Sequence, residues 1–453
     1  MLGVRGVLLA MLLGPAAFGT WALLRLAMRY SSLTGLSVYR GLELELLQRK
    51  SSGSEPSDRP ARSALGFGLL LSGGISAVAL GSSFAVESAS DRLVLRAFAA
   101  ASLAECLYGY AQVCTRVRGN IRVFSLLETG TSVLHVICAG VLGWIWGLAG
   151  AFAGLTLANL LGTAAASRWM ELKPELRLEP VRRLLKVGIP VVLTVCVGIM
   201  LSTGDRWVVA LWGGQTMLGH YAFAGSLTTG AAALALVIRT VVFPEVYGQA
   251  SSAGAASALQ RHLERTLLPF ARILPPLLGA ASVAVGPVVA LAMPEYREAI
   301  APARIFLLSG AAMGLVNLAS VGAVAAGRQR QLPLYAASAL AVTFALSIVA
   351  LAGGYGLGSV AAATFVGHVM FAALVLRLNV REAGIPGAER FVATILLPLV
   401  WCTLAVGVVG WMVSGWDLRG TVMALAAYLL LLIPLVPGWR KEWHRLSGGG
   451  RVI

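Results

Sequence analysis

Residues 202–224 read STGDRWVVALWGGQTMLGHYAFA, and they contain the end of one apolar run, a turn and the beginning of the next run. The glycines and polar residues of WGGQTMLG are typical of a turn between two helices. Asp205 lies about seven residues before Trp212, roughly 10 Å inside the first run at ~1.5 Å of helical rise per residue. Charges inside a membrane helix are costly and usually functional. Asp205 and Arg206 therefore predict the wall of a polar cavity rather than the end of a span.

The composition is that of a polytopic membrane protein. Of the 453 residues, 58% are hydrophobic and 12% are charged, and the mean hydropathy is +0.80. Soluble domains carry roughly a quarter of charged residues. Apolar runs of about 20 residues, the length that crosses a bilayer as a helix, follow one another along the chain and leave no room for a separate soluble domain. The five cysteines are scattered inside these runs, so we expect small buried side chains and neither a disulfide, a metal site nor a cofactor.

Fourteen apolar windows predict an all-α polytopic membrane protein of about fourteen transmembrane helices, the first of them incomplete. The predicted helices span residues 1–13, 17–47, 64–87, 91–115, 122–143, 146–168, 188–211, 219–243, 267–292, 300–326, 332–352, 356–377, 391–413 and 419–437.

The breaks between these windows alternate in charge. One set, together with the C-terminal tail, holds 24 of the 36 lysines and arginines, and the other set holds only Arg92, Arg297 and Arg419. By the positive-inside rule both termini are cytoplasmic and the number of spans is even. We expect the membrane to be a bacterial-type cytoplasmic (inner) membrane. The net charge of +16 is therefore largely a signal of topology. No basic segment interleaved with aromatic residues supports binding of nucleic acid.

Nine arginines remain at or within membrane depth: Arg5, Arg25, Arg29, Arg40, Arg96, Arg206, Arg239, Arg272 and Arg304. On insertion scales, an arginine near a helix centre costs about 2.5–3.5 kcal/mol. The second predicted helix carries four charged residues on one face, in a stripe about 27 Å long at ~1.5 Å per residue: Arg25, Arg29, Arg40 and Glu43. This stripe predicts the lining of a polar cavity, and the alternative is an interfacial helix end that carries Arg40 and Glu43.

The eighth predicted helix carries a weaker copy of this pattern, because Tyr221 and Arg239 are eighteen residues apart and coincide in angle. The alternative is that Tyr221 is an aromatic residue of the membrane interface and that Arg239 snorkels to the cytoplasmic end. A carboxylate inside a span, such as Asp205 or Glu105, is a candidate for proton or sodium coupling, although Glu105 can equally pair with an arginine.

An internal repeat relates the two halves of the chain. The sequence GPAAFGTWA at residues 14–22 matches GQTMLGHYA at residues 214–222, so Gly pairs with Gly twice, Trp with Tyr and Ala with Ala. Both copies lie at an outer turn, six spans apart, as a parallel repeat about the membrane normal requires, with substrate between the halves. The offset of 200 places Arg5 opposite Asp205. It also predicts that the first span begins before residue 1, so we expect an upstream start or a truncated chain.

Three stretches carry a resemblance to a known family: LLGPAAFGTWALL, YSSLTGLSVYRGL, and the block from VGIPVVL through GDRWVVALW to VVFPEVY. They resemble polysaccharide (O-antigen type) flippases of the multidrug/oligosaccharidyl-lipid/polysaccharide (MOP) exporter superfamily. The resemblance implies two six-helix lobes around a central cavity plus two trailing helices. It also implies alternating access for a polyprenyl-diphosphate-linked oligosaccharide. We expect the lobes at 1–180 and 181–385, and the trailing helices with the basic tail at 386–453. In the turn GLSVYRG, relatives often carry an acidic residue in a stretch similar to Asp-Leu-Gly, and this chain has no acidic residue there.

A diphosphate in a low-dielectric cavity needs permanent cations, and arginine stays charged there with bidentate geometry. We expect substrate contacts from five arginines: Arg25, Arg29, Arg40, Arg206 and Arg239. We expect coupling or orienting roles for three acidic residues: Asp205, which would hold an arginine in place, Glu43 and Glu105. The rivals are a multidrug antiporter, which needs an acidic pocket, and a lipid II flippase. An enzyme acting on lipid-linked sugars would need catalytic residues, usually on a sizeable outer loop. The predicted outer breaks are short, so we expect a transporter without catalytic residues.

Overall fold

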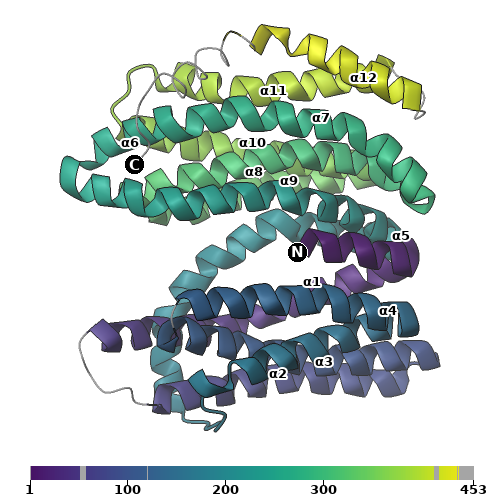
Figure 1. Ribbon diagram of the computed structural model, residues 1–453, viewed down its shortest axis with the longest axis vertical. Coiled ribbons are helices and arrows are strands. Elements are labelled where there is room, and N and C mark those ends of the chain that lie inside the picture. Colours follow the sequence, from purple (N-terminus) through teal and green to yellow (C-terminus); the bar gives the residue numbers. More distant parts are fainter. Residues whose placement is uncertain (1, 52–57, 120, 413–417, 436, 438–453) are drawn as a thin grey trace. The chain divides into compact units, whose positions relative to one another are not determined.

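The computed structural model describes the chain except for residues 1, 52–57, 120, 413–417, 436 and 438–453 (Figure 1). Throughout the described residues the regular structure is helical. The chain divides into two compact units, Met1–Ile199 and Met200–Ile453. The predicted division into parts at residues 180 and 385 stays a prediction.

Unit 1 is a bundle of four long helices and the beginning of a fifth. These are α1 (Leu2–Ser51), α2 (Arg59–Ala85), α3 (Ala89–Arg118), α4 (Ile121–Ala165) and the first part of α5 (Leu178–Ala253). Helix α3 packs between α2 and α4, and α1 packs against all three (Figure 1).

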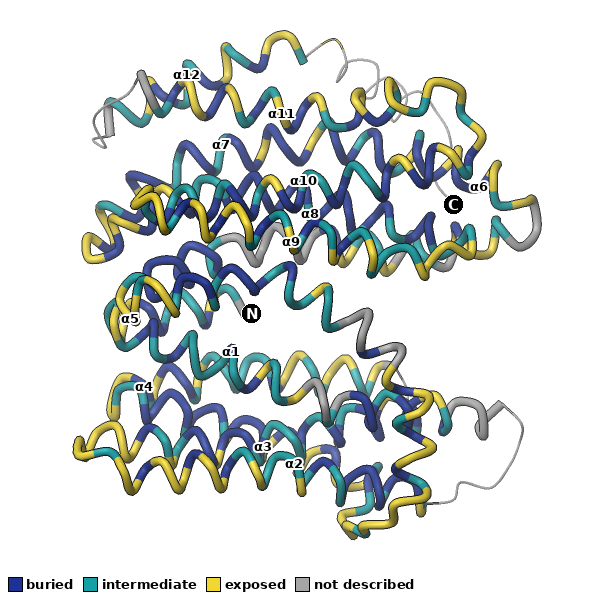
Figure 2. The backbone as a smooth tube through the Cα atoms, turned by 180° about the vertical axis from the view of Figure 1, so that it is seen from behind, coloured by how far each residue is buried: buried dark blue, intermediate teal, exposed yellow. Residues whose placement is uncertain are grey.

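Unit 2 contains the rest of α5 and seven further helices. These are α6 (Ala255–His262), α7 (Leu268–Ala292), α8 (Ile300–Ala325), α9 (Leu332–Ala352), α10 (Gly356–Glu382), α11 (Ala388–Met412) and α12 (Leu418–Leu431). A π-helical turn at Leu263–Leu267 joins α6 to α7 without a break. Helix α8 is buried along most of its length and packs against α7 and α10, so it forms the centre of unit 2 (Figure 2). Helices α11 and α12 pack against α7.

The predicted fold class is confirmed. Helices α1, α4 and α5 are each broken by a glycine with positive φ, at Gly14, Gly147 and Gly214. Counted at these breaks, with α6 and α7 as one segment, the described residues form fourteen helical segments, as the apolar windows predict. Nine helices within the described residues are long and apolar enough to cross a membrane. Trp144, Trp146 and Trp212 are exposed beside two of the breaks, where aromatic residues anchor spans at the membrane interface.

The two glycines of the predicted repeat have the same backbone conformation. Gly14 has φ 73° and ψ 169°, and Gly214 has φ 73° and ψ −172°. The aromatic residues of the repeat, Trp21 and Tyr221, are both buried, although their ring partners are not equivalent positions. Trp21 packs on Phe152 with 4.6 Å between ring centroids, and Tyr221 packs on Phe306 at 5.0 Å. An offset of 200 residues therefore relates equivalent positions of the two units.

Replacing Gly214 with alanine is expected to destabilise the protein by about 1–3 kcal/mol, because its φ and ψ lie in a region essentially restricted to glycine. A Cβ at this position meets no atom within 4 Å, so the cost is one of backbone strain alone. Chemical unfolding of the detergent-solubilised protein measures it. Gly74→Ala is the matched control, since Gly74 lies inside α2 with equally open space, and alanine there favours the helix. Equal stability of Gly214→Ala and wild type would contradict the prediction.

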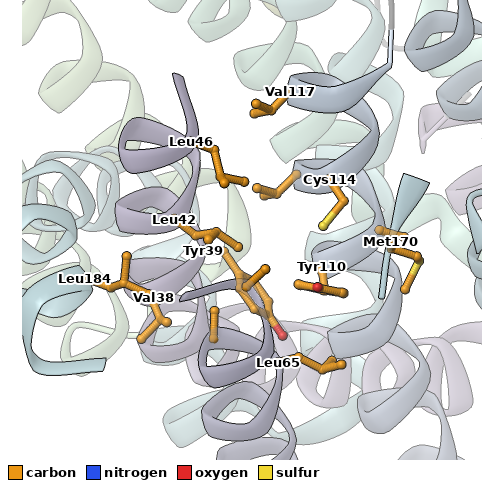
Figure 3. Close-up of a cluster of buried hydrophobic side chains, with 14 of the residues drawn as sticks. Val38, Tyr39, Leu42, Leu46, Leu65, Tyr110, Cys114, Val117, Met170 and Leu184 are labelled. Atoms are coloured by element: carbon orange, nitrogen blue, oxygen red, sulfur yellow. The ribbon is translucent and has the colours of Figure 1, made fainter. Parts of the chain in front are cut away.

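The core of unit 1 fixes the second half of α1 against α2 and α3 (Figure 3). Val38, Leu42 and Leu46 recur every four residues and so lie on one face of α1. They pack with side chains from the facing helices, among them Tyr110 and Cys114, which are fully buried. Cys114 is a free thiol, as expected of a small buried side chain.

Candidate functional site

Unit 1 encloses a cavity of about 270 Å³ between α1, α2, α3 and α4. Its lining mixes apolar side chains with charged and polar ones, notably Arg5, Arg25, Glu105, Gln112, His135 and Asn159. Such a lining, apolar with a few convergent polar groups, is typical of a ligand site.

The centre of the polar lining is an ion pair between α1 and α3. The Nη1 atom of Arg25 lies 2.6 Å from Oε2 of Glu105, and the two side chains are 25% and 31% exposed. Both groups therefore remain accessible to a ligand. Arg5 lines the same cavity and is only 8% exposed. Among the described residues of the lining, two arginines face one carboxylate, so with neutral histidine the cavity carries a net charge of +1.

Arg5 reaches this cavity because α1 breaks at Gly14. The break folds α1 into a hairpin of two helical arms, with Arg5 on the first arm and Arg25 on the second. Arg5 is one of the nine arginines at membrane depth but is not among those expected to contact substrate. The signal that finds it is the internal repeat, which matches Arg5 with Asp205.

Neutral polar groups complete the wall. His135 Nε2 lies 2.8 Å from Asn159 Oδ1, which joins the two arms of α4. The hydroxyl of Tyr108 donates to Glu128 at 3.0 Å, and the Tyr108 and His135 rings are nearly perpendicular with their centroids 6.4 Å apart. Amide, imidazole and hydroxyl groups at these positions can bind sugar hydroxyls or phosphate oxygens.

The predicted stripe of α1 divides between two places. Arg25 lines the cavity, whereas Arg29 is exposed and does not belong to the lining. Arg40 instead pairs with Glu43 at 2.6 Å, and Glu43 also pairs with Arg116 of α3 at 2.8 Å. Arg40 and Glu43 thus belong to an ion-pair cluster near the other end of α1, outside the cavity lining.

In unit 2, Asp205 is buried at 2% exposure and bound by hydroxyl groups. Its Oδ2 accepts from the hydroxyl of Tyr221 at 2.6 Å and from Thr364 of α10 at 2.8 Å. Its Oδ1 accepts from the backbone amide of Arg206 at 2.9 Å. These partners are hydroxyls and an amide rather than the arginine that the sequence analysis expects. Tyr221 is fully buried, so it is not an interface aromatic.

A histidine lies beside this cluster. His368, one helical turn after Thr364, is 2.5 Å from the hydroxyl of Ser309 through Nδ1 and 3.3 Å from the carbonyl of Leu201 through Nε2. We call Asp205, Tyr221, Thr364 and His368 the Asp205 cluster. No local pattern in the sequence identifies Thr364 and His368 as members, because they lie about 160 residues from Asp205.

The other two predicted arginines are both partly buried. The Arg206 guanidinium lies against Gly225, where a Cβ would be within 2.7 Å of Nη2. Arg239 lies in the same helix, α5. Neither arginine lines the cavity of unit 1. Both remain predictions as substrate contacts.

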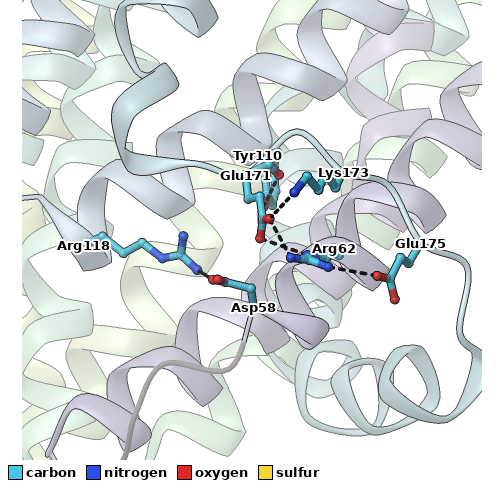
Figure 4. Close-up of polar contacts among 7 residues, drawn as sticks. All are labelled: Asp58, Arg62, Tyr110, Arg118, Glu171, Lys173 and Glu175. Atoms are coloured by element: carbon cyan, nitrogen blue, oxygen red, sulfur yellow. Dashed lines mark hydrogen bonds and ion pairs between the residues drawn. The ribbon is translucent and has the colours of Figure 1, made fainter.

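A second ionic network ties the segment between α4 and α5 to α2 and α3 (Figure 4). Arg62 of α2 pairs with Glu171 at 2.6 Å and with Glu175 at 3.1 Å. The hydroxyl of Tyr110 donates to the carbonyl of Glu171, and Arg118 of α3 pairs with Asp58 just before α2. Hydrogen bonds from Arg62 lower the pKa of Glu171 and of Glu175.

This network predicts an acid-sensitive contribution to stability. Because folding lowers both carboxyl pKa values, the stabilisation is present above the unfolded value of about 4.3 and is lost as the pH falls through the folded values. We expect Arg62→Gln to melt below wild type at pH 7, with a difference that stays nearly constant down to about pH 4.3 and shrinks as the pH falls further towards about 2. Thermal unfolding in detergent across this pH range measures it, with Arg59→Gln, an exposed arginine three residues earlier, as the control. A difference independent of pH would contradict the prediction.

Comparisons with known proteins agree with this architecture. A family model described as "Polysaccharide biosynthesis protein" matches residues 8–301. The chain is similar to the lipid II flippase MurJ in an inward closed conformation, with a TM-score of 0.71 and 13% identity over 98% of this chain and 97% of that chain. It is also similar to an inward-facing multidrug resistance MATE family transporter of the MOP superfamily, with a TM-score of 0.66 and 11% identity over 90% of this chain and 95% of that chain.

A third similar structure is a MOP superfamily transporter from Pyrococcus furiosus, described as having a binding pocket of reverse polarity. Its TM-score is 0.51, with 14% identity over 87% of this chain and 99% of that chain. No curated protein sequence matches the chain. The chain thus shares its fold with these transporters. The chain belongs to the polysaccharide biosynthesis protein family, and the resemblance drawn from the sequence is confirmed.

Proposed function

We propose that this protein is a flippase for a polyprenyl-diphosphate-linked oligosaccharide, which it moves across a bacterial-type cytoplasmic membrane by alternating access for synthesis of cell-surface polysaccharide. The observation that carries the proposal is the net positive cavity of unit 1, with Arg5, Arg25 and Glu105 in its wall. Membership of a polysaccharide biosynthesis family and the fold shared with a lipid II flippase support it. Both termini are cytoplasmic, as the distribution of arginines and lysines predicts.

The chemistry of a diphosphate fits this cavity. Arginine keeps its charge at any physiological pH, and its planar guanidinium binds phosphate oxygens in a bidentate manner. Arg25 already holds a carboxylate oxygen at 2.6 Å, so its position suits an anionic oxygen. At about 270 Å³ the cavity is slightly smaller than typical small-molecule sites of about 300–1,000 Å³. It therefore takes the diphosphate and its nearest sugar rather than a whole oligosaccharide.

We further propose that the Asp205 cluster carries a coupling cation, a proton or a sodium ion. Arg5 and Asp205 are equivalent positions of the repeat, each nine residues before a glycine of the same conformation. Equivalent sites thus carry opposite charges, one suited to an anionic substrate and the other to a cation. A carboxylate that accepts two hydroxyl groups in a buried site offers oxygen ligands to a cation and an acceptor for a proton.

The two rival transport functions differ from this proposal in their substrates. A multidrug exporter of organic cations requires an acidic pocket, whereas the described cavity has more arginines than carboxylates. A lipid II flippase moves the same diphosphate with a different sugar, so the cavity charge suits both substrates. Membership of the polysaccharide biosynthesis family favours the oligosaccharide.

Reconstitution into proteoliposomes tests the proposal. A labelled undecaprenyl-diphosphate sugar is added to one leaflet, and its appearance in the other leaflet is followed with a leaflet-selective reagent. We expect wild type to move this lipid faster than protein-free vesicles. Unlabelled lipid II as competitor measures selectivity for the sugar, and a cationic dye measures multidrug transport. Export of the dye without movement of the lipid diphosphate would overturn the proposal.

A further inference from the structure

We infer that Glu105 is a built-in counter-ion, which holds Arg25 when the cavity is empty and competes with the substrate diphosphate for it. This inference rests on the proposed function, because it assigns to one residue the control of substrate affinity at the same site.

The geometry shows a pair that a ligand can open. Glu105 is on α3 and Arg25 is on α1, so the ion pair joins two helices of the cavity wall rather than neighbours on one helix. Both side chains line the cavity and are a quarter or more exposed. In contrast, Glu43 is 11% exposed, and its two arginine partners lie outside the lining. An incoming anion can thus reach the Arg25–Glu105 pair directly.

The charges in the cavity define what Glu105 does. Without its carboxylate the lining would carry the charges of Arg5 and Arg25, a net +2 in a partly buried space. With it the net charge is +1, so Glu105 replaces part of the negative charge that a diphosphate brings. A phosphate oxygen and the Glu105 carboxylate compete for the Arg25 guanidinium, because an N–H group that donates to one oxygen is not free for the other. The two anionic groups also repel each other at close range. Glu105 therefore weakens substrate binding and favours release.

A carrier needs a group that limits its affinity for substrate, because a site that binds substrate too tightly releases it slowly and lowers turnover. The protein accordingly has a cavity cationic enough to admit a diphosphate and a carboxylate placed to re-form an ion pair as the diphosphate leaves. Glu105 is a positioning and specificity residue in this scheme.

Replacing Glu105 with glutamine tests the inference, since it keeps the size of the side chain and removes its charge. We expect Glu105→Gln to bind inorganic pyrophosphate about tenfold more tightly than wild type, which corresponds to about 1.4 kcal/mol. In proteoliposomes we expect its KM for the lipid diphosphate and its kcat both to fall. Isothermal titration calorimetry of the full-length protein in detergent gives the affinity, and thermal unfolding confirms that each variant is folded.

Three further variants make the result specific. Glu105→Asp restores the negative charge and should return the affinity towards that of wild type. Glu43→Gln removes a carboxylate that is also paired with arginines, but Glu43 lies about 27 Å from Arg25 along α1 at ~1.5 Å per residue. This substitution should leave pyrophosphate affinity unchanged. Arg25→Ala should weaken binding.

The two hypotheses fail in different ways. If folded Glu105→Gln binds pyrophosphate no more tightly than wild type, while Arg25→Ala binds it more weakly, the inference about Glu105 is overturned and the proposed function stands. If wild type binds no pyrophosphate and moves no lipid diphosphate, the proposed function itself is overturned.

Discussion

Replacing Arg25 with alanine is expected to lower the rate of lipid-diphosphate transport by about 10- to 100-fold. Hydrogen bonds to charged groups contribute about 1.5–3 kcal/mol, and each 1.4 kcal/mol is a factor of ten. The substitution also leaves Glu105 without the guanidinium that lies 2.6 Å away, so the cavity changes from net positive to neutral. Initial rates in proteoliposomes measure the loss. Arg25→Lys, which keeps the charge but loses bidentate geometry, should fall between alanine and wild type.

Substitutions of two other arginines test whether the effect is specific to the cavity. Arg96→Ala is the matched control, because Arg96 is an exposed arginine of α3 that lies over the ring of Phe84 rather than in the cavity. Arg29→Ala separates the cavity from the stripe predicted on α1, since Arg29 shares the stripe but not the lining. Equal losses for Arg25→Ala and Arg29→Ala would show that the whole stripe, rather than the cavity, binds substrate.

The architecture could be predicted from the sequence because the turns that separate its helices have local sequence signals. The turns GPAAF, GWIWG and WGGQTMLG each contain a glycine that the structure places at positive φ, where most other residues are strained. Apolar run length gives the helices between these turns. Neither signal depends on contacts between distant parts of the chain, so fourteen helices and their order could be read directly.

The site could be predicted only in part, because a helical stripe defines a face and not the partner that faces it. Arg25 of the stripe on α1 lines the cavity, whereas Arg40 and Glu43 form an ion-pair cluster with Arg116, which lies more than seventy residues further along the chain. The hydroxyl partner of Asp205 at Thr364 is 159 residues away and likewise leaves no local pattern. The repeat is the long-range signal that the sequence does contain, and it alone relates Arg5 to Asp205.

The second large effect is expected at Asp205. In wild type, a tenfold gradient of the coupled cation supplies about 1.4 kcal/mol for each cation, enough to shift the distribution of lipid diphosphate about tenfold. We expect Asp205→Asn to lose this response, because the amide takes up no proton and lacks the negative charge that attracts a cation to the buried site bound by Tyr221 and Thr364. Transport into one leaflet is measured under a proton gradient and, separately, under a sodium gradient. The gradient that drives wild type identifies the ion.

Control measurements distinguish a loss of ion coupling in Asp205→Asn from a loss of folding. Downhill movement of the lipid without a gradient should persist in Asp205→Asn, since the cavity of unit 1 keeps its arginines. Thr364→Val removes one hydroxyl that donates to the carboxylate and should weaken the gradient response without abolishing it. Asp91→Asn, an exposed aspartate in the first turn of α3, should respond as wild type does. A folded Asp205→Asn protein that still follows either gradient would exclude Asp205 as the coupling site, because no titratable or anionic oxygen would remain at that position.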